Sequence, residues 1–181
     1  KCAAKYEFSR EDQDNFAIQS YKRSAEAWAS GKFKEEIVPV EIPQRKGEPI
    51  IFSEDEEYKN VNFDRIGTLP TVFQKENGTV TAANASPLND GASALVVTSS
   101  EVADARGLKP LAKVVAYASN SQHPSEFTIA PVGAIEKVLA KAGWSASDVD
   151  LWEVNEAFAM VTMLAIDGFH LDPAKVNPMG G

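Results

Sequence analysis

Apolar residues near the start of the chain recur at the spacing of a helix. Ser9 has the character of an N-cap, and Asp12 three residues later completes a capping box. The apolar positions that follow are three to four residues apart: Ile18, Tyr21, Ala25 and Trp28. One face of a helix repeats at this interval, and Gly31 provides a helix end. The pattern predicts a long helix between Ser9 and Gly31.

Farther along the chain, short apolar runs alternate with helical patterns. The runs typical of strands are Ile37–Ile42, Thr79–Ala83, Ala94–Thr98, Ala112–Ala118 and Val149–Val154. The helical patterns are Glu101–Arg106, Ala134–Ala142 and Ala157–Phe169. Pro131 and Gly143 stand where the start and the end of the middle helix are expected. Alternation of this kind predicts an α/β fold with βαβ units.

Residues 43–78 interrupt this order. Glycines and prolines occur in them at irregular intervals, together with the acidic run Glu54–Glu57. A long segment of this kind inside a compact protein is usually functional or poorly ordered. We therefore expect irregular structure between the first helix and the second half of the chain.

Charge and cysteine content narrow the class of function. The net charge of −8 and the lack of a basic block argue against binding to nucleic acid. A single cysteine allows no intramolecular disulfide and no cysteine-rich metal site. No apolar run approaches the ~20 residues of a membrane span, which argues against a membrane partner. The sequence opens without a methionine or a leader, so we expect any targeting segment to lie outside it.

The segment Trp152–Ala159 places polar side chains between an apolar strand pattern and a helical one. Asn155 and Glu156 are neighbours at that junction. Ligands of α/β folds bind at the carboxyl ends of strands, so this pair is a candidate site. An isolated Asn at such a position is more often an ordinary helix cap.

The string Asn155–Phe158 resembles the N-E-A-F signature of the thiolases, and three further segments resemble motifs of the same family. Gly78–Ala92 is similar to the block G-T-V-T-A-x-N-A-S-x-L-N-D-G-A, and Ser9–Asp14 is similar to S-R-x-x-Q-D. Lys32–Val40 is similar to the segment G-x-F-x-x-E-I-x-P-V. These motifs follow one another in family order over nearly the whole chain.

Within the family, three more segments resemble the mitochondrial acetoacetyl-CoA thiolases: Ala17–Tyr21, Glu54–Tyr58 and Val72–Gly78. The resemblance implies an α/β fold that is part of the layered αβαβα thiolase core, together with a loop domain that covers CoA. In this layout residues 1–88 form most of the loop domain. Residues 89–110 return to the N-terminal core domain, and residues 111–181 begin the C-terminal core domain.

The implied activity is acyl transfer: thiolysis of acetoacetyl-CoA, or condensation of two acetyl-CoA molecules. The family attacks its substrate with a cysteine of a C-x-S-G segment, assisted by a G-H-P histidine and a C-x-G-G cysteine. None of these motifs surrounds Cys2, His123 or His170. We therefore expect the chain to be the middle-to-late portion of a thiolase and to be inactive by itself.

By resemblance, Asn155 orients the water of an oxyanion hole. A neutral carboxamide suits that role because it holds a water in place without titrating near neutral pH. Glu156 is either a general base or a supporting carboxylate, and the second interpretation is favoured.

The resemblance also implies a set of CoA-binding residues. Ala157 and Phe158 would line the pantetheine tunnel, with Phe73, Ala82 and Ser86 around the same moiety. The nucleotide end of CoA would be held by Asn60, Val61, Asn62 and Arg65, the last through stacking and phosphate pairing. Without the resemblance, Ser86 would be a turn former and residues 60–65 a solvated loop.

A potassium ion beside the CoA site is a further implication. Its ligands would be the Tyr21 hydroxyl, which also borders CoA, and the backbone carbonyls of Ala82, Ala83 and Ala85. The alternative for Tyr21 is a core tyrosine whose hydroxyl has a hydrogen-bond partner.

The expected partners are acyl-CoA substrates, with CoA as substrate or product and no tightly bound cofactor. By resemblance the complete protein is a mitochondrial homo-oligomer, a dimer or a tetramer. Three alternatives stay open: a 3-ketoacyl-CoA thiolase of broader chain length, a non-catalytic CoA-binding relative, and a structural module that reuses part of a thiolase.

Overall fold

The computed structural model describes residues 1–181, and helices form most of its regular structure. The α-helices are α1 (Cys2–Lys5), α2 (Arg10–Ala29), α3 (Glu57–Asn60), α4 (Ser100–Ala105), α5 (Ala130–Ala142) and α6 (Ala159–Phe169). Four 3-10 helices complete them: η1 (Phe63–Thr68), η2 (Pro124–Ile129), η3 (Ala146–Asp148) and η4 (Pro173–Lys175). The one sheet is an antiparallel hairpin of β1 (Val40–Ile42) and β2 (Ile50–Phe52), in which Val40 pairs with Phe52.

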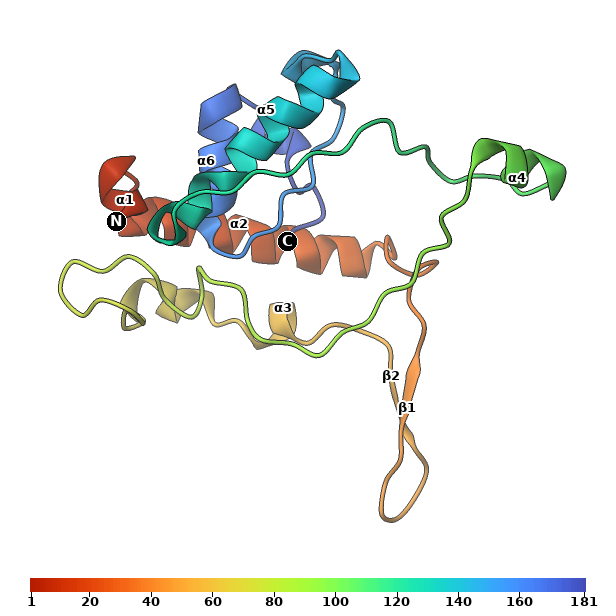
Figure 1. Cartoon of the computed structure of the whole chain (residues 1–181). Helices are drawn as coiled ribbons and strands as arrows, with labels where there is room; N and C mark the ends of the chain where they lie inside the picture. The colour runs from red at the N-terminus through yellow and green to blue at the C-terminus, as the bar shows by residue number, and fades with distance from the viewer.

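Helix α2 is the central element, and its predicted capping box is confirmed. The Ser9 hydroxyl accepts a hydrogen bond from the Asp12 backbone amide at 3.0 Å, and the Asp12 carboxylate accepts one from the Ser9 amide at 2.8 Å. Gly31 follows the helix with φ of 71°, a left-handed conformation that glycine adopts readily. In Figure 1, α5 and α6 lie on one side of α2, and the segment that carries α3 and η1 lies on the other side.

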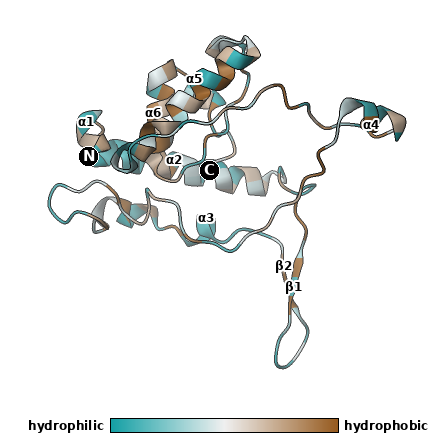
Figure 2. Ribbon diagram, in the orientation of Figure 1, coloured by the Kyte–Doolittle hydropathy of each residue, from teal (hydrophilic) through white to brown (hydrophobic).

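The main core lies between α5, α6 and the segment that enters α6. Its buried residues are Leu139, Trp152, Val154, Val161, Ala165, Leu171 and Val176. Figure 2 shows hydrophobic turns in α5 and α6, whereas α3 and the tip of the hairpin are hydrophilic. The predicted end of α5 is confirmed, because Gly143 caps it with φ of 71°. Helix α6 begins at Ala159, two residues after the predicted start.

Helix α4 lies apart from the core, between two segments without regular structure that lead to it and away from it (Figure 1). The strands predicted at residues 94–98 and 112–118 lie in these segments, and the structure contains neither. Val96 is 94% exposed and Val114 is 72% exposed. A strand exists only where the backbone of a neighbour pairs with it, and no backbone segment of this chain pairs with these residues.

The other predicted strands are also shorter than expected or absent. Residues 149–154 form only a single parallel bridge, between Trp152 and Val176, so the predicted βαβ units contain no parallel sheet within this chain. Residues 79–83 end in a turn. The strand predicted at 37–42 is shortened to β1, and residues 43–78 contain β2, α3 and η1 rather than irregular structure alone.

Candidate functional site

The loop of residues 79–86 is held in place by the side chain of Asn84. Its Oδ1 accepts from the Thr81 amide at 2.8 Å, and its Nδ2 donates to the Thr79 carbonyl at 2.9 Å. The same Nδ2 donates to Oδ1 of Asp14 at 2.9 Å, which ties the loop to α2. Asn84 is 3% exposed and Thr81 is fully buried, so these bonds are shielded from water. A shielded and fully paired amide fixes the conformation of its loop.

Arg10 extends this network to a second loop. Its Nε lies 2.7 Å from Oδ2 of Asp14, and its terminal nitrogen donates to the carbonyls of Ile66 and Leu69 at 2.9 and 3.2 Å. Both carboxylate oxygens of Asp14 are therefore occupied, one by Arg10 and one by Asn84. Two loops far apart in sequence are anchored to one turn of α2.

A pocket of about 290 Å³ lies between these loops and α2. The residues that line it are Tyr21, Glu57, Asn60, Val61, Asn62, Arg65, Ile66, Leu69, Ala82 and Ala83. All four residues predicted for the nucleotide end of CoA are in this list, as are three of the four predicted potassium ligands. The structure therefore brings together residues from α2, α3, η1 and the 79–86 loop in one concave surface.

Tyr21 contributes a neutral hydroxyl to this pocket. Burial raises the pKa of Tyr21, and the nearby Glu57 carboxylate raises it further, so the phenol keeps its proton at neutral pH. The backbone carbonyls of Ala82, Ala83 and Ala85 accept none of the hydrogen bonds of the structure. A phenol and unpaired carbonyls are neutral oxygen ligands of the kind that a weakly hydrated monovalent cation binds. The carboxylate of Glu57 adds one negative charge nearby.

A second group of predicted residues meets at the start of α6. Ala85 and Phe158 form an antiparallel bridge, in which Ser86 N donates to the Ala157 carbonyl at 3.1 Å and Ala159 N donates to the Asn84 carbonyl at 2.9 Å. The rings of Phe73 and Phe127 both pack edge-on against Phe158, at centroid distances of 6.3 and 5.8 Å. Four of the five residues predicted for pantetheine, Phe73, Ser86, Ala157 and Phe158, thus lie in this group, whereas Ala82 lines the 290 Å³ pocket. Phe127 was not predicted from the sequence.

Asn155 lies between this group and the core, and its side chain is exposed. It makes no side-chain hydrogen bond within the chain, whereas its neighbours Val154 and Glu156 are both bonded to Asn177. An unpaired, exposed carboxamide next to a fixed backbone is available to a ligand or a water. The structure gives Asn155 no role as a helix cap, since Phe158 is the residue before α6, and the binding role of Asn155 stays a prediction.

The carboxylates near Asn155 differ in their surroundings. Oε1 of Glu156 accepts from Nδ2 of Asn177 at 2.6 Å. Burial raises the pKa of Glu153, and the Glu156 carboxylate raises it further. Glu156 is thus engaged as a hydrogen-bond acceptor, which favours the supporting role over that of a free base.

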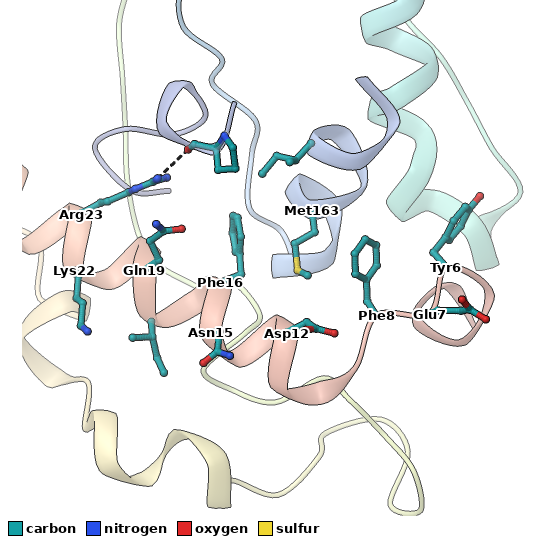
Figure 3. A pocket seen from close by; sticks show the side chains of 13 residues that line it. Tyr6, Glu7, Phe8, Asp12, Asn15, Phe16, Gln19, Lys22, Arg23 and Met163 are labelled. Carbon is teal, nitrogen blue, oxygen red and sulfur yellow. Dashed lines mark hydrogen bonds between the residues drawn. The ribbon is translucent and has the colours of Figure 1, made fainter. Parts of the chain in front are cut away.

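The C-terminal residues 173–181 pack along α2. Arg23 donates to the carbonyls of Val176 and Pro173 at 2.7 and 2.8 Å, and Ser20 exchanges hydrogen bonds with Gly181. A larger cavity, of about 900 Å³, is lined by residues of α2, by Met163 of α6 and by Pro173. Figure 3 shows Phe16, Lys22 and Arg23 along it. None of the predicted CoA residues lines this cavity.

The cysteine and the two histidines of the chain lie in packing or capping positions. Cys2 is buried in a cluster with Met160 and Leu164, and its thiol lies 3.7 Å from the Ser125 carbonyl. His123 caps η2 through the Ser125 amide, and His170 ends α6 in a left-handed conformation with φ of 51°. No three acidic, cysteine or histidine side chains gather as a metal site. No helix combines the length and the apolar character needed to cross a lipid bilayer.

Both parts of the chain match sequence profiles of one family. Residues 1–101 match the thiolase N-terminal domain, and residues 108–181 match the thiolase C-terminal domain. The chain therefore belongs to the thiolase family. The division of the chain at residues 88 and 110 stays a prediction.

Relatives of known name agree with this membership. The chain is 50% identical over 179 residues to the mitochondrial acetyl-CoA acetyltransferase of Rattus norvegicus. It is 51% identical over 179 residues to the mitochondrial acetyl-CoA acetyltransferase B of Xenopus laevis. Both matches cover 99% of this chain, but only 42% and 43% of the relatives. The chain thus spans less than half of the length of these enzymes.

Solved thiolases have the same fold. The Acat5 thiolase of Ascaris suum, determined in complex with coenzyme A, matches 100% of this chain and 46% of its own, with a TM-score of 0.94 and 41% identity. The acetyl-CoA acetyltransferase of Bacillus anthracis matches 99% of this chain and 45% of its own, with a TM-score of 0.93 and 40% identity. The likeness includes the segments around α4, so their course is that of the thiolase fold. The predicted α/β thiolase fold is confirmed.

Proposed function

We propose that the full-length protein is an acetyl-CoA C-acetyltransferase, in which residues 1–181 supply the CoA pocket and one oxyanion-hole residue. In one direction CoA cleaves acetoacetyl-CoA into two acetyl-CoA molecules, and in the other direction two acetyl-CoA molecules condense to acetoacetyl-CoA and CoA. The observation that carries the proposal is the 290 Å³ pocket, because it collects Tyr21, Asn60, Arg65 and Ala82 from separate segments. The 50% identity to mitochondrial acetyl-CoA acetyltransferases supports the same reaction.

CoA would enter with its nucleotide end in this pocket. The guanidinium of Arg65 offers a plane for stacking and a positive charge for a phosphate, which matters in a chain of net charge −8. The pantetheine arm would then pass Ser86, whose hydroxyl can bond an amide, and follow the bridge to Phe158. The rings of Phe73, Phe127 and Phe158, which pack edge to face, would offer an apolar wall to that path.

The acyl group would reach Asn155 at the end of the path. Thiolysis places negative charge on a carbonyl oxygen in the transition state, and a preorganised donor stabilises that charge. Asn155 would hold a water toward this oxygen, because its own side chain is exposed and unpaired. The cysteine nucleophile and the histidine of the family motifs would come from parts of the full-length protein outside residues 1–181.

A potassium ion would be held by the Tyr21 hydroxyl and the carbonyls of Ala82, Ala83 and Ala85. These groups fit a weakly hydrated cation because the phenol is neutral and the carbonyls are free. The ion would supply positive charge that keeps the 79–86 loop in its CoA-binding conformation. The names of the relatives support a mitochondrial location, and we propose that the full-length protein assembles as a homo-oligomer there.

The proposal is tested by following CoA-dependent cleavage of acetoacetyl-CoA by the full-length protein, with longer 3-ketoacyl-CoA thioesters in parallel. We expect turnover with acetoacetyl-CoA and a preference for it over the longer substrates. Equal turnover across chain lengths would indicate a broader thiolase. CoA binding without cleavage of any substrate would indicate a non-catalytic relative and would refute the proposed activity.

A further inference from the structure

Asn177 is a buried residue whose carboxamide oxygen and nitrogen are fully hydrogen-bonded. It is 1% exposed, and its backbone has a left-handed φ of 44°. Oδ1 accepts from the Val154 amide at 2.7 Å. Nδ2 donates one proton to the Val154 carbonyl at 2.7 Å and the other to Oε1 of Glu156 at 2.6 Å. A carboxamide has two donors and one acceptor group, and all three are engaged here.

This side chain takes the place of a strand. The parallel bridge between Trp152 and Val176 is made by Trp152 N to the Lys175 carbonyl and Asn177 N to the Trp152 carbonyl, both at 2.8 Å. A continuing ladder would next satisfy both polar groups of Val154 with backbone. The chain instead turns away at Asn177, and the carboxamide makes the two bonds that the missing backbone would have made.

The position of Asn177 is itself fixed by α2. Arg23 donates to the carbonyls of Val176 and Asn177, at 2.7 and 3.2 Å. From the other side, the Thr162 hydroxyl of α6 lies 3.5 Å from the Val154 carbonyl. The residues on either side of Asn155 are thus connected to two helices, whereas the Asn155 side chain has no partner of its own.

We propose that Asn177 is a positioning residue: its carboxamide clamps Val154 and Glu156 and thereby sets the direction in which Asn155 faces the reacting thioester. The proposal rests on the function proposed above for Asn155. Asn177 touches neither substrate nor reacting atoms and acts through its two neighbours. The amide and carbonyl of Val154 need one acceptor and one donor from this side chain, and Glu156 takes the second donor, so a residue without all three groups would lose at least one of these bonds.

The test is Asn177→Asp in the full-length protein, because Asp has the same shape and tolerates a left-handed backbone. It replaces the donor Nδ2 by an oxygen that faces the Val154 carbonyl and the Glu156 carboxylate. We expect kcat for acetoacetyl-CoA thiolysis to fall by about ten- to a hundredfold, the loss typical of a misplaced catalytic group. The KM should change by less than about twofold, since the CoA pocket is formed by other residues.

Asn77→Asp is the matched control. Asn77 is also in a left-handed conformation, with φ of 56°, but it is exposed and takes no part in the site. The same chemical change there should leave both kcat and KM at the wild-type values. A loss of kcat at Asn77 equal to that at Asn177 would overturn the proposal, because it would mean that the charge alone is responsible.

Rescue separates positioning from a purely structural role. In Asn177→Asp two carboxylates face each other. Adding Glu156→Gln replaces one of them by a carboxamide that can donate to the other, so kcat should recover by roughly threefold or more over the single variant. Glu156→Gln alone serves as the reference for this cycle. If the double variant is no better than the two single losses combined, Asn177 does not act through Glu156.

Circular dichroism shows whether Asn177→Asp folds. If it does not, Glu156→Ala provides the second test, because it removes only the outer contact of Asn177, and it should lower kcat without raising KM. Wild-type turnover in that variant would overturn the proposal. An inactive wild-type protein would refute the proposed function itself, whereas an active wild type with a fully active Asn177→Asp would refute only the role of Asn177.

Discussion

Asp14 and Asn84 are 70 residues apart in sequence, and their side chains meet in the protein interior at 2.9 Å. Asp14 also binds Arg10 of the same helix, which donates to the carbonyls of Ile66 and Leu69. Asn84 also binds the backbone of Thr79 and Thr81. This single contact connects the helix that carries Tyr21 with the loop that carries Ala82 and Ala83. The shape of the proposed CoA pocket depends on it.

Asn84→Asp is expected to destabilise the full-length protein and to weaken CoA binding. The change replaces a donor by a carboxylate that faces Asp14 and the Thr79 carbonyl, and a buried polar group without its partner costs about 1–3 kcal/mol. Thermal denaturation and the KM for CoA should both report the change. Asn15→Asp introduces the same charge at an exposed position of α2 and should change neither. Unaltered stability in Asn84→Asp would show that the buried contact is not needed.

Tyr21→Phe tests the potassium site. The substitution removes one oxygen and keeps the ring, so the packing of the ring should be preserved. We expect K⁺ to stimulate thiolysis by the wild-type full-length protein at constant ionic strength, and Na⁺ not to replace it. The stimulation should be smaller in Tyr21→Phe. A flat K⁺ titration in the wild type would remove the cation from the account, and an unchanged one in the variant would remove Tyr21 from the site.

Gly180→Ala should destabilise the contact between the C-terminal residues and α2. Gly180 has φ of 82°, and a Cβ there would lie 2.7 Å from the Ser20 carbonyl oxygen and collide with the Ser24 hydroxyl. Left-handed strain alone costs an alanine about 1–2 kcal/mol, and the collision adds to it. Gly47→Ala has similar strain, with φ of 88° and no atom within 4 Å, and is the control. Equal melting temperatures for the two variants would contradict the close approach.

Residues 1–181 alone should show no thiolysis of acetoacetyl-CoA. The only thiol, Cys2, is buried among Met160 and Leu164, and a thiol with no base beside it is a poor nucleophile. The assay compares the purified polypeptide with a reaction that contains no protein. Turnover above that background that disappears in Cys2→Ser would show that a nucleophile has been overlooked.

The sequence predicted helices better than strands, and the reason is physical. The ends of α2 and α5 are set by local groups, Ser9 with Asp12 and Gly143, which act within a few residues. A strand depends on a partner that can be far away in sequence. Val96 and its neighbours have the apolar pattern of a buried strand, but within this chain they have no partner and remain exposed.

The residues of the proposed CoA pocket were predicted through resemblance, and the structure shows that they lie close together. The roles of Asn84 and Asn177 were not predicted. Asn84 contacts Asp14, 70 residues away in sequence, and Asn177 contacts Val154, 23 residues away. No local pattern reveals which distant group a buried carboxamide will meet.

The most direct test of the account is the kcat of acetoacetyl-CoA thiolysis by the full-length protein with Asn155→Asp. The variant keeps the volume of the side chain and places a carboxylate beside developing negative charge. Loss of an oxyanion-hole donor costs about 3 kcal/mol, so kcat should fall roughly a hundredfold. The melting temperature should be unchanged, because Asn155 is exposed and makes no side-chain hydrogen bond within the chain. Near wild-type turnover in Asn155→Asp would contradict the placement of the reacting thioester at this residue.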